Sequence, residues 1–346
     1  MSEAPAPARP MRLLVSYWYF RTVDLDHWIA RHVDPGTPVD LFADSGGFTA
    51  DTKGVEISVE EYAAWIERWR HLLSTVATLD VIGDARATAR NTAALRDLTD
   101  VPIIPAFHVN EPWHELAQLI EEGETYIALG GQVGKPARAL IAWGAEAFRI
   151  ADGAAVFHGF GVGQVPSLRA LPWYSCDSST WLIPWKFGGK VTFTDELWRP
   201  VTTALLAVRD STRRYPMRSA WERATDPRAQ RLLHSRGIDP TVLIDLDGHF
   251  AHPDLPNGRE AHDPYMPHTA QVGTIVDDAH RLEDRARALH GEVARPGHPD
   301  APPGLRYYFV AWNDRYMTPW HRARYDHPDY PGPAEPVWLP PPEEDP

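Results

Sequence analysis

Two aspartates of this chain each follow a short apolar run and stand where a carboxylate could do chemistry. Asp44 follows the run 39–43 and precedes Ser45 and two glycines, and Asp177 follows the run 173–176. In folds built from parallel strands, the carboxyl ends of the strands meet at one edge, where reactive groups gather. Two carboxylates facing each other there suit displacement at a sugar carbon, in which one attacks as nucleophile and the other moves protons. The alternative is that each aspartate is only an N-cap or a loop residue of the turn between a strand and the next helix.

Other polar or glycine positions follow the remaining apolar runs. They are Asp80 and Asp84 near the third run, His108 after the fourth, Gly130 and Gly131 after the fifth, and His158 with Gly161 after the sixth. Glycines leave room for a flat ligand and expose backbone groups that can hydrogen-bond its edges. We therefore expect a site for a planar ligand at the same edge as the two aspartates.

The elements that must position these residues are strands alternating with helices. Eight short apolar runs read as strands, at 13–17, 39–43, 78–82, 102–107, 126–129, 155–158, 173–176 and 190–193. Helical periodicity is clearest over 58–76, where Ser58 with Glu61 forms a capping box, and it recurs over 111–122. Strands that alternate with helices pair in parallel, and eight units predict an α/β fold of the (β/α)8 barrel type. Few helices separate the later runs, so an irregular barrel is expected.

Composition sets the broad class and the domain plan. The chain has 346 residues, of which 43% are hydrophobic and 23% charged, enough for a large core. We expect a disordered tail at 1–11, a barrel over 12–236, a C-terminal extension over 237–335 and a disordered acidic, Pro-rich tail at 336–346. No run of 18 apolar residues and no signal peptide is evident, so the expected location is cytoplasmic, with no membrane contact.

Six segments in a fixed order carry a family resemblance. They read DSGGF (44–48), LDVIGD (79–84), PIIPAFH (102–108), YIALGG (126–131), HGFGVG (158–163) and CDSSTW (176–181). Together they resemble the tRNA-guanine transglycosylase (queuine tRNA-ribosyltransferase) superfamily, over about residues 12–195. The chain looks most similar to the phage-like DNA-guanine transglycosylase branch, which inserts 7-deazaguanines into DNA.

The resemblance implies a pentosyltransferase that exchanges guanine for a 7-deazaguanine, such as a preQ0-like base, without a cofactor. By position, Asp177 would attack C1′ as nucleophile, and Asp44 would be the general acid and base. Asp80 would recognise the purine edge, and Gly130 and Gly131 would bind the base through their backbone. The remaining base-binding candidates are Ser45, Gly46, Asp84, His108, His158 and Gly161.

Two departures from the tRNA enzymes stand out. His108 lies near the position of their glutamine, and their zinc subdomain needs three cysteines where this chain has only Cys176. We therefore expect no zinc subdomain and no bound metal, and we expect Cys176 to be a buried strand residue. The loop histidines 249, 252, 262 and 268 match no known ligand spacing and are interpreted as solvated. The missing subdomain favours DNA over tRNA, although tRNA stays open.

An arginine-rich segment is the candidate nucleic-acid surface. Residues 209–236 hold eight arginines against three acids, and the residues expected to contact nucleic acid are Arg213, Arg214, Tyr215, Arg218 and Trp221. Arginines interleaved with aromatics suit phosphate contact and base stacking, and the alternative is a solvated helix pair. A guanine in duplex DNA must leave the stack, so the extension is a candidate clamp, and a helper protein could open the duplex.

Two other functions remain open at this point. One keeps the chemistry but transfers glycosyl groups between a small sugar donor and a free deazapurine, which the net charge of -13 favours. The other is a catalytically silent barrel that binds nucleic acid or partner proteins.

Overall fold

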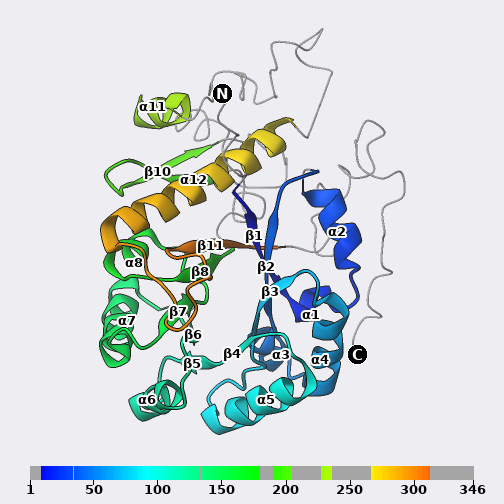
Figure 1. Cartoon of the computed structure of the whole chain (residues 1–346). Helices are drawn as coiled ribbons and strands as arrows, with labels where there is room; N and C mark the ends of the chain where they lie inside the picture. The colour runs from blue at the N-terminus through cyan, green and yellow to red at the C-terminus, as the bar shows by residue number, and fades with distance from the viewer. Residues whose placement is uncertain are drawn as a thin grey trace, which may run out of the picture. The chain divides into compact units, whose positions relative to one another are not determined.

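Nine parallel strand segments form a nearly closed barrel in the computed structural model (Figure 1). The structure describes residues 9–33, 35–132, 135–179, 190–204, 227–235 and 266–311. The barrel strands are β1 (Met11–Ser16), β2 (Val39–Asp44), β3 (Leu73–Ala77), β4 (Ile103–Ile104), β5 (Ala106–His108), β6 (Tyr126–Gly130), β7 (Val156–Gly159), β8 (Ser175–Ser178) and β11 (Arg306–Val310). Their order in the sheet is β4-β3-β2-β1-β11-β8-β7-β6-β5. The prediction of an α/β fold with a barrel of parallel strands is confirmed.

Pro105 explains why the two ends of the sheet lie next to each other in the chain. It separates β4, which pairs with β3, from β5, which pairs with β6. Proline has no backbone N–H and interrupts a ladder, but its carbonyl still accepts from the Ala128 N–H at 2.8 Å. The fourth strand is therefore one interrupted strand, and the nine segments correspond to eight barrel positions.

The eighth barrel position is filled by β11, which lies between β8 and β1. We expected residues 190–193 to fill it, and that expectation was wrong. Those residues belong to β9 (Lys190–Thr194), which pairs antiparallel with β10 (Pro200–Ala204) in a separate two-stranded sheet. The compact unit that holds the barrel comprises residues 1–178 and 286–346, and residues 179–285 form a second unit. The barrel thus takes a strand from the segment that we assigned to the extension.

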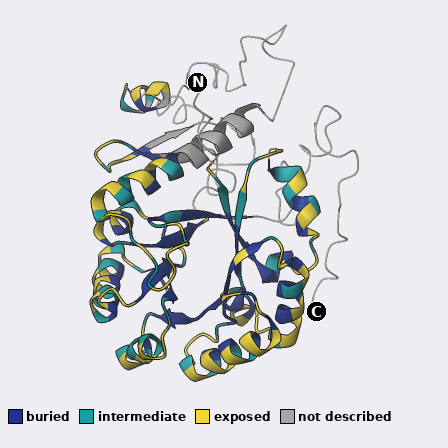
Figure 2. Cartoon of the chain, viewed as in Figure 1, coloured by how far each residue is buried: buried dark blue, intermediate teal, exposed yellow. Residues whose placement is uncertain are grey.

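Helices connect the strands and cover the outside of the barrel, with their exposed faces turned outward (Figure 2). Those of the barrel unit are α1 (Tyr17–Phe20), α2 (Leu25–His32), α3 (Gly47–Thr52), α4 (Val59–Trp69), α5 (Ala85–Leu98), α6 (Trp113–Glu121), α7 (Ala137–Ala151) and α8 (Val165–Ala170). The second unit contains α11 (Pro227–Ser235) and most of α12 (Met266–His290). Ser58 caps α4 as predicted, accepting from the Glu61 N–H at 3.3 Å.

The helix predicted over 58–76 is too long, because α4 ends at Trp69 and β3 begins at Leu73. Apolar residues of the strand continue the helical spacing by coincidence, whereas Thr75 and Val76 are β-branched and favour a strand. The third strand is consequently five residues earlier than the predicted 78–82. Val81 and Ile82 are exposed and lie in the connection to α5.

The barrel interior is filled mainly by apolar and aromatic side chains. The buried cluster consists of Leu14, Phe42, Ala77, Ile104, Ala106, Tyr126, Ala128, Val156, Tyr174 and Tyr308. Side chains two residues apart on a strand share a face. A residue two positions beyond a core residue on the same strand therefore points to the interior, nearer the carboxyl end of the barrel.

Candidate active site

The alternation along the strands brings the predicted site residues together at one end of the barrel. Asp44 lies two residues after Phe42, His108 two after Ala106 and His158 two after Val156, and all three preceding residues belong to the buried cluster. Asp177 follows Ser175, whose hydroxyl lies 2.7 Å from His158 Nδ1. The same periodicity that fills the core therefore aims this group of polar side chains at the carboxyl ends of the strands.

Asp44 is a carboxyl group that holds a proton near neutral pH. Burial, together with the negative charges of Asp80 and Asp177, raises the pKa of Asp44 to about 7. The Gly46 N–H donates to Asp44 Oδ2 at 3.1 Å. This bond and the Ser16 hydroxyl lower the pKa of Asp44, but by less than burial and the two charges raise it. A group with this pKa can both give and take a proton at physiological pH.

The turn after Asp44 is built to approach Asp80 closely. Gly46 begins the turn at a φ of 76°, in the left-handed region that suits glycine. A Cβ on Gly47 would lie 2.6 Å from Asp80 Oδ1, so only glycine fits there. The Gly47 N–H donates to Ser45 Oγ at 3.1 Å, and Ser45 Oγ donates to Asp80 Oδ1, also at 3.1 Å. The two glycines after β2 thus allow contact between two loops of the protein.

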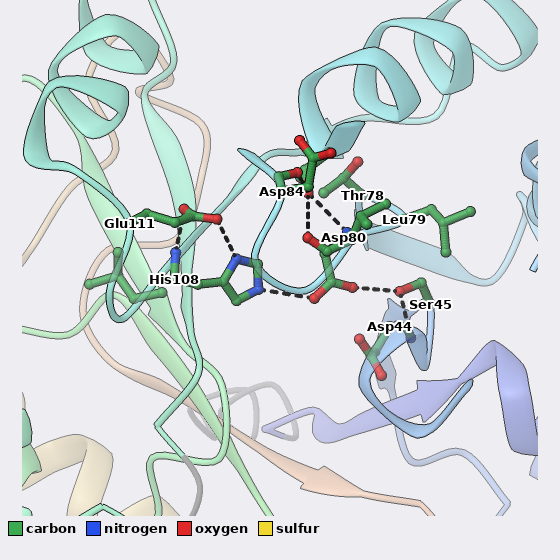
Figure 3. A network of polar contacts seen from close by, with 12 residues as sticks. Asp44, Ser45, Thr78, Leu79, Asp80, Asp84, His108 and Glu111 are labelled. Atoms are coloured by element: carbon green, nitrogen blue, oxygen red, sulfur yellow. Dashed lines mark hydrogen bonds and ion pairs between the residues drawn. The ribbon is translucent and has the colours of Figure 1, made fainter. Parts of the chain in front are cut away.

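His108 lies between two carboxylates (Figure 3). Its Nε2 is 3.0 Å from Asp80 Oδ2 and its Nδ1 is 3.3 Å from Glu111 Oε1, while the His108 backbone N–H donates to Glu111 Oε2 at 2.8 Å. Burial lowers the pKa of His108, but the two carboxylates outweigh it and raise that pKa to about 9. The imidazole is therefore a cation at pH 7, and both of its N–H groups are directed at carboxylates. This arrangement holds Asp80 in place.

Gly130 is required by the imidazole of His108. A Cβ at residue 130 would lie 2.6 Å from His108 Cδ2 and 2.9 Å from His108 Nε2. The space that we expected this glycine to leave for a ligand is therefore occupied by His108. Gly131 follows with a φ of 73°, in the left-handed region.

Asp177 is held through one of its two carboxylate oxygens. The Gly161 N–H donates to Oδ1 at 2.8 Å, and His158 Nε2 lies 3.3 Å from the same oxygen. Within the described residues no hydrogen bond reaches Oδ2. Among the described residues, Asp177 therefore has one oxygen held by a backbone donor and one oxygen without a hydrogen bond.

A buried chain of polar groups supports Asp177 from inside the barrel. Tyr126 Oη lies 2.5 Å from Ser175 Oγ, which lies 2.7 Å from His158 Nδ1. The His158 ring is fully buried and stacks on Phe42, with 4.4 Å between the ring centroids. Burial lowers the pKa of His158, even though Asp177 acts to raise it. His158 is thus a neutral imidazole at pH 7.

Asp84 caps a helix and is not part of the cluster formed by Asp44, Asp80, His108 and Asp177. It is the N-cap of α5, where its Oδ1 accepts from the Ala87 N–H at 2.9 Å, and its side chain is exposed. Figure 3 shows the Asp84 carboxylate turned away from His108. Asp84 is thus a capping residue, whereas the N-cap of the helix after Asp44 is Gly46, and Asp177 lies within β8.

Several contributors to the site were missed by sequence reasoning. Glu111 could have been noticed, because it follows His108 by three residues and could bond back to it. Ser175 and Tyr126 carried no such signal, since each looks like an ordinary residue within an apolar run. The predicted nucleic-acid contacts at 213, 214, 215, 218 and 221 lie outside the described residues, as do the histidines at 249, 252 and 262 and the side chain of His268.

Cys176 is buried in β8, as predicted. The described part of the chain holds no group of three histidine, cysteine or acidic side chains placed to bind a metal ion. Among the helices in that part, none is both long enough and apolar enough to cross a membrane.

Comparison with known proteins leaves the family undecided: no protein-family model matches the sequence, and no curated protein matches it.

Proposed function

We propose that this protein is a transglycosylase that exchanges guanine in nucleic acid for a 7-deazaguanine, through a covalent intermediate on Asp177. The observation that carries the proposal is the pairing of two unlike carboxyl groups at the barrel's carboxyl end. The pKa of Asp44 is about 7, and Asp177 keeps one oxygen free of hydrogen bonds among the described residues. A proton donor beside a nucleophilic carboxylate is what double displacement at an anomeric carbon needs.

In the first step, Asp177 Oδ2 bonds to C1′ while the C1′–N9 bond of guanine breaks. The electron pair of that bond leaves on guanine, which takes the proton from Asp44. In the second step, the ionised Asp44 accepts the N9 proton of the incoming base. The base then attacks C1′, and the C1′–Oδ2 bond breaks with its electrons returning to Asp177.

Asp80 is proposed to recognise the purine edge. Each of its oxygens already accepts one hydrogen bond, from Ser45 and from His108, and each retains a second lone pair. Those lone pairs can accept from the N1–H and the amino group of guanine. His108 then acts by fixing Asp80, because its own N–H groups face Asp80 and Glu111.

DNA is the favoured substrate for two reasons. The sequence resembles the DNA-guanine transglycosylase branch, and the chain lacks the cysteines that hold the zinc subdomain of the tRNA enzymes. The test is exchange of isotopically labelled guanine into single-stranded DNA, duplex DNA, tRNA and guanosine nucleotides, in the wild type and in Asp44→Asn and Asp177→Asn. Exchange into DNA that both substitutions lower by at least about 10³-fold would support the proposal. Exchange only into nucleotides would favour the small sugar donor, and binding of nucleic acid that survives both substitutions without exchange would favour a silent binding barrel.

A further inference from the structure

The buried Nε2 of His158 lies at an unusual place for an imidazole nitrogen. It is shielded from solvent and lies 3.3 Å from Asp177 Oδ1, but its alignment is not that of a hydrogen bond. Buried polar atoms without a hydrogen bond are rare and cost stability, so they call for an explanation. Hydrogen bonds between catalytic side chains are often long or misaligned in the free enzyme, and they shorten only when substrate is bound.

The neighbours of His158 determine which of its nitrogens carries the proton. One chain of hydrogen bonds runs from Tyr126 Oη through Ser175 Oγ to His158 Nδ1. The hydroxyl groups can point along this chain in either direction, and the direction decides whether Nδ1 accepts or donates. If the Tyr126 hydroxyl donates to Ser175, the Ser175 hydroxyl donates to Nδ1, and the proton of the neutral ring is then on Nε2, facing Asp177. The reverse direction would turn the lone pair of Nε2 toward a carboxylate, which is repulsive.

We propose that His158 is a positioning residue for Asp177, whose Nε2–H holds Oδ1, leaves Oδ2 to react and stabilises the carboxylate as it leaves C1′. This inference rests on the proposed function, in which Asp177 is the nucleophile. The Gly161 N–H donates to Oδ1 at 2.8 Å, and the His158 Nε2–H, once aligned, is the second donor to the same oxygen. Two N–H donors on that oxygen would stabilise the negative charge that develops on the carboxylate as the C1′–Oδ2 bond breaks in the second step.

Loss of the His158 Nε2–H should affect the two steps of the reaction in opposite directions. A carboxylate that loses a donor becomes a more basic nucleophile but a poorer leaving group. Removal of the Nε2–H should therefore slow the release of Asp177 from the intermediate more than it slows the attack. The covalent adduct should accumulate, which a general loss of folding would not produce.

His158→Phe is the variant of choice, because a phenyl ring keeps the stacking on Phe42 and removes both nitrogens. His158→Gln is the matched rescue variant, since its amide can donate from a position near that of Nε2. Adduct formation and breakdown would be timed by intact mass, using a guanine-containing single-stranded DNA and then a free 7-deazaguanine base. We expect breakdown to slow at least about tenfold in His158→Phe and to recover largely in His158→Gln.

Breakdown that is unchanged in His158→Phe, or that slows no more than adduct formation does, would overturn the inference while leaving the proposed function in place. If the wild type forms no adduct with any guanine substrate, the proposed function fails, and the role of His158 in it fails as well. A separate readout does not depend on activity: ¹⁵N NMR of the histidine-labelled full chain, with His158→Phe to assign the signal. We expect a protonated Nε2 and an unprotonated Nδ1 at pH 7, and a proton on Nδ1 would contradict the inference.

Discussion

At the scale of single residues, the difference between Asp44 and Asp177 matters more than either side chain alone. Like charges that approach each other inside a protein cannot both ionise freely, so one of them holds a proton. Here Asp44 holds it, because burial and the charges of Asp80 and Asp177 raise its pKa to about 7. Asp177 differs from Asp44 in that its Oδ1 accepts the backbone N–H of Gly161.

The rate of adduct formation should therefore fall as the pH rises through about 7. Asp44 must be protonated to assist the departing guanine, and the protonated fraction drops about tenfold for each pH unit above its pKa. Single-turnover rates between pH 5.5 and 9 would check this expectation. A rate that stays flat across that range would show that Asp44 is not the acid of the first step.

His108 should stabilise the fold in a pH-dependent way. Its pKa is raised to about 9 in the folded state, above the ordinary value of 6.5, so its contribution is fully present below pH 6.5 and is lost as the pH rises through 9. His108→Gln should lower the free energy of unfolding by about 2–4 kcal/mol at pH 7, because it leaves two partly buried carboxylates without their cation. The loss should be smaller at pH 10.

Urea unfolding of both forms at the two pH values measures this difference. His114→Gln is the matched control, since His114 is exposed and its substitution should change the free energy of unfolding by less than about 0.5 kcal/mol. An equal loss for His108→Gln at pH 7 and pH 10 would contradict the charged role of His108.

At the scale of elements, the strand-end pattern predicted much of the site because period-2 alternation is short-range and visible in the sequence. It identified Asp44, His108 and Asp177 correctly as residues at strand ends. It did not reveal that Gly130 accommodates His108, since that contact joins β5 and β6 across the sheet. The overlong helix before β3 arose because apolar spacing alone does not distinguish the end of a helix from the start of a strand.

Gly130→Ala should displace His108 and weaken its bond to Asp80. The added Cβ would meet a ring fixed by two carboxylates, so we expect a loss of about 1–3 kcal/mol in the free energy of unfolding and a lower exchange rate. Gly144→Ala is the control: its Cβ would meet the end of the flexible Leu171 side chain, and alanine favours the helix. Equal effects of the two substitutions, measured by thermal unfolding, would argue against a fixed His108.

At the scale of the whole molecule, the barrel is closed by a strand that comes late in the chain. β8 ends at Ser178 and β11 begins at Arg306, and β11 pairs with both β8 and β1. The sequence could not assign this pairing, because the apolar run at 190–193 was nearer and the cost of closing a loop rises only slowly with its length. Connectivity over such a distance leaves no local signal.

A chain that stops at residue 300 should lose the cooperative unfolding of the barrel. Without β11, β1 and β8 would both expose unpaired edges, and Tyr308 would leave the core together with its hydrogen bond to Asp40. Circular dichroism with thermal unfolding would measure the effect, and Tyr308→Phe would report the hydrogen bond alone, at about 1 kcal/mol. A truncated chain that unfolds like the full one would show that β11 is not needed to close the barrel.

The proposed reaction depends on a covalent bond between Asp177 and the sugar of a guanine nucleotide. The most direct measurement is intact mass after denaturation, for the chain incubated with guanine-containing DNA, in the wild type and in Asp177→Asn. We expect an added mass equal to that of the DNA strand less guanine, which a free 7-deazaguanine base releases and which is missing in Asp177→Asn. An adduct that persists in Asp177→Asn, or its absence in a wild type that does exchange guanine, would contradict the proposed reaction.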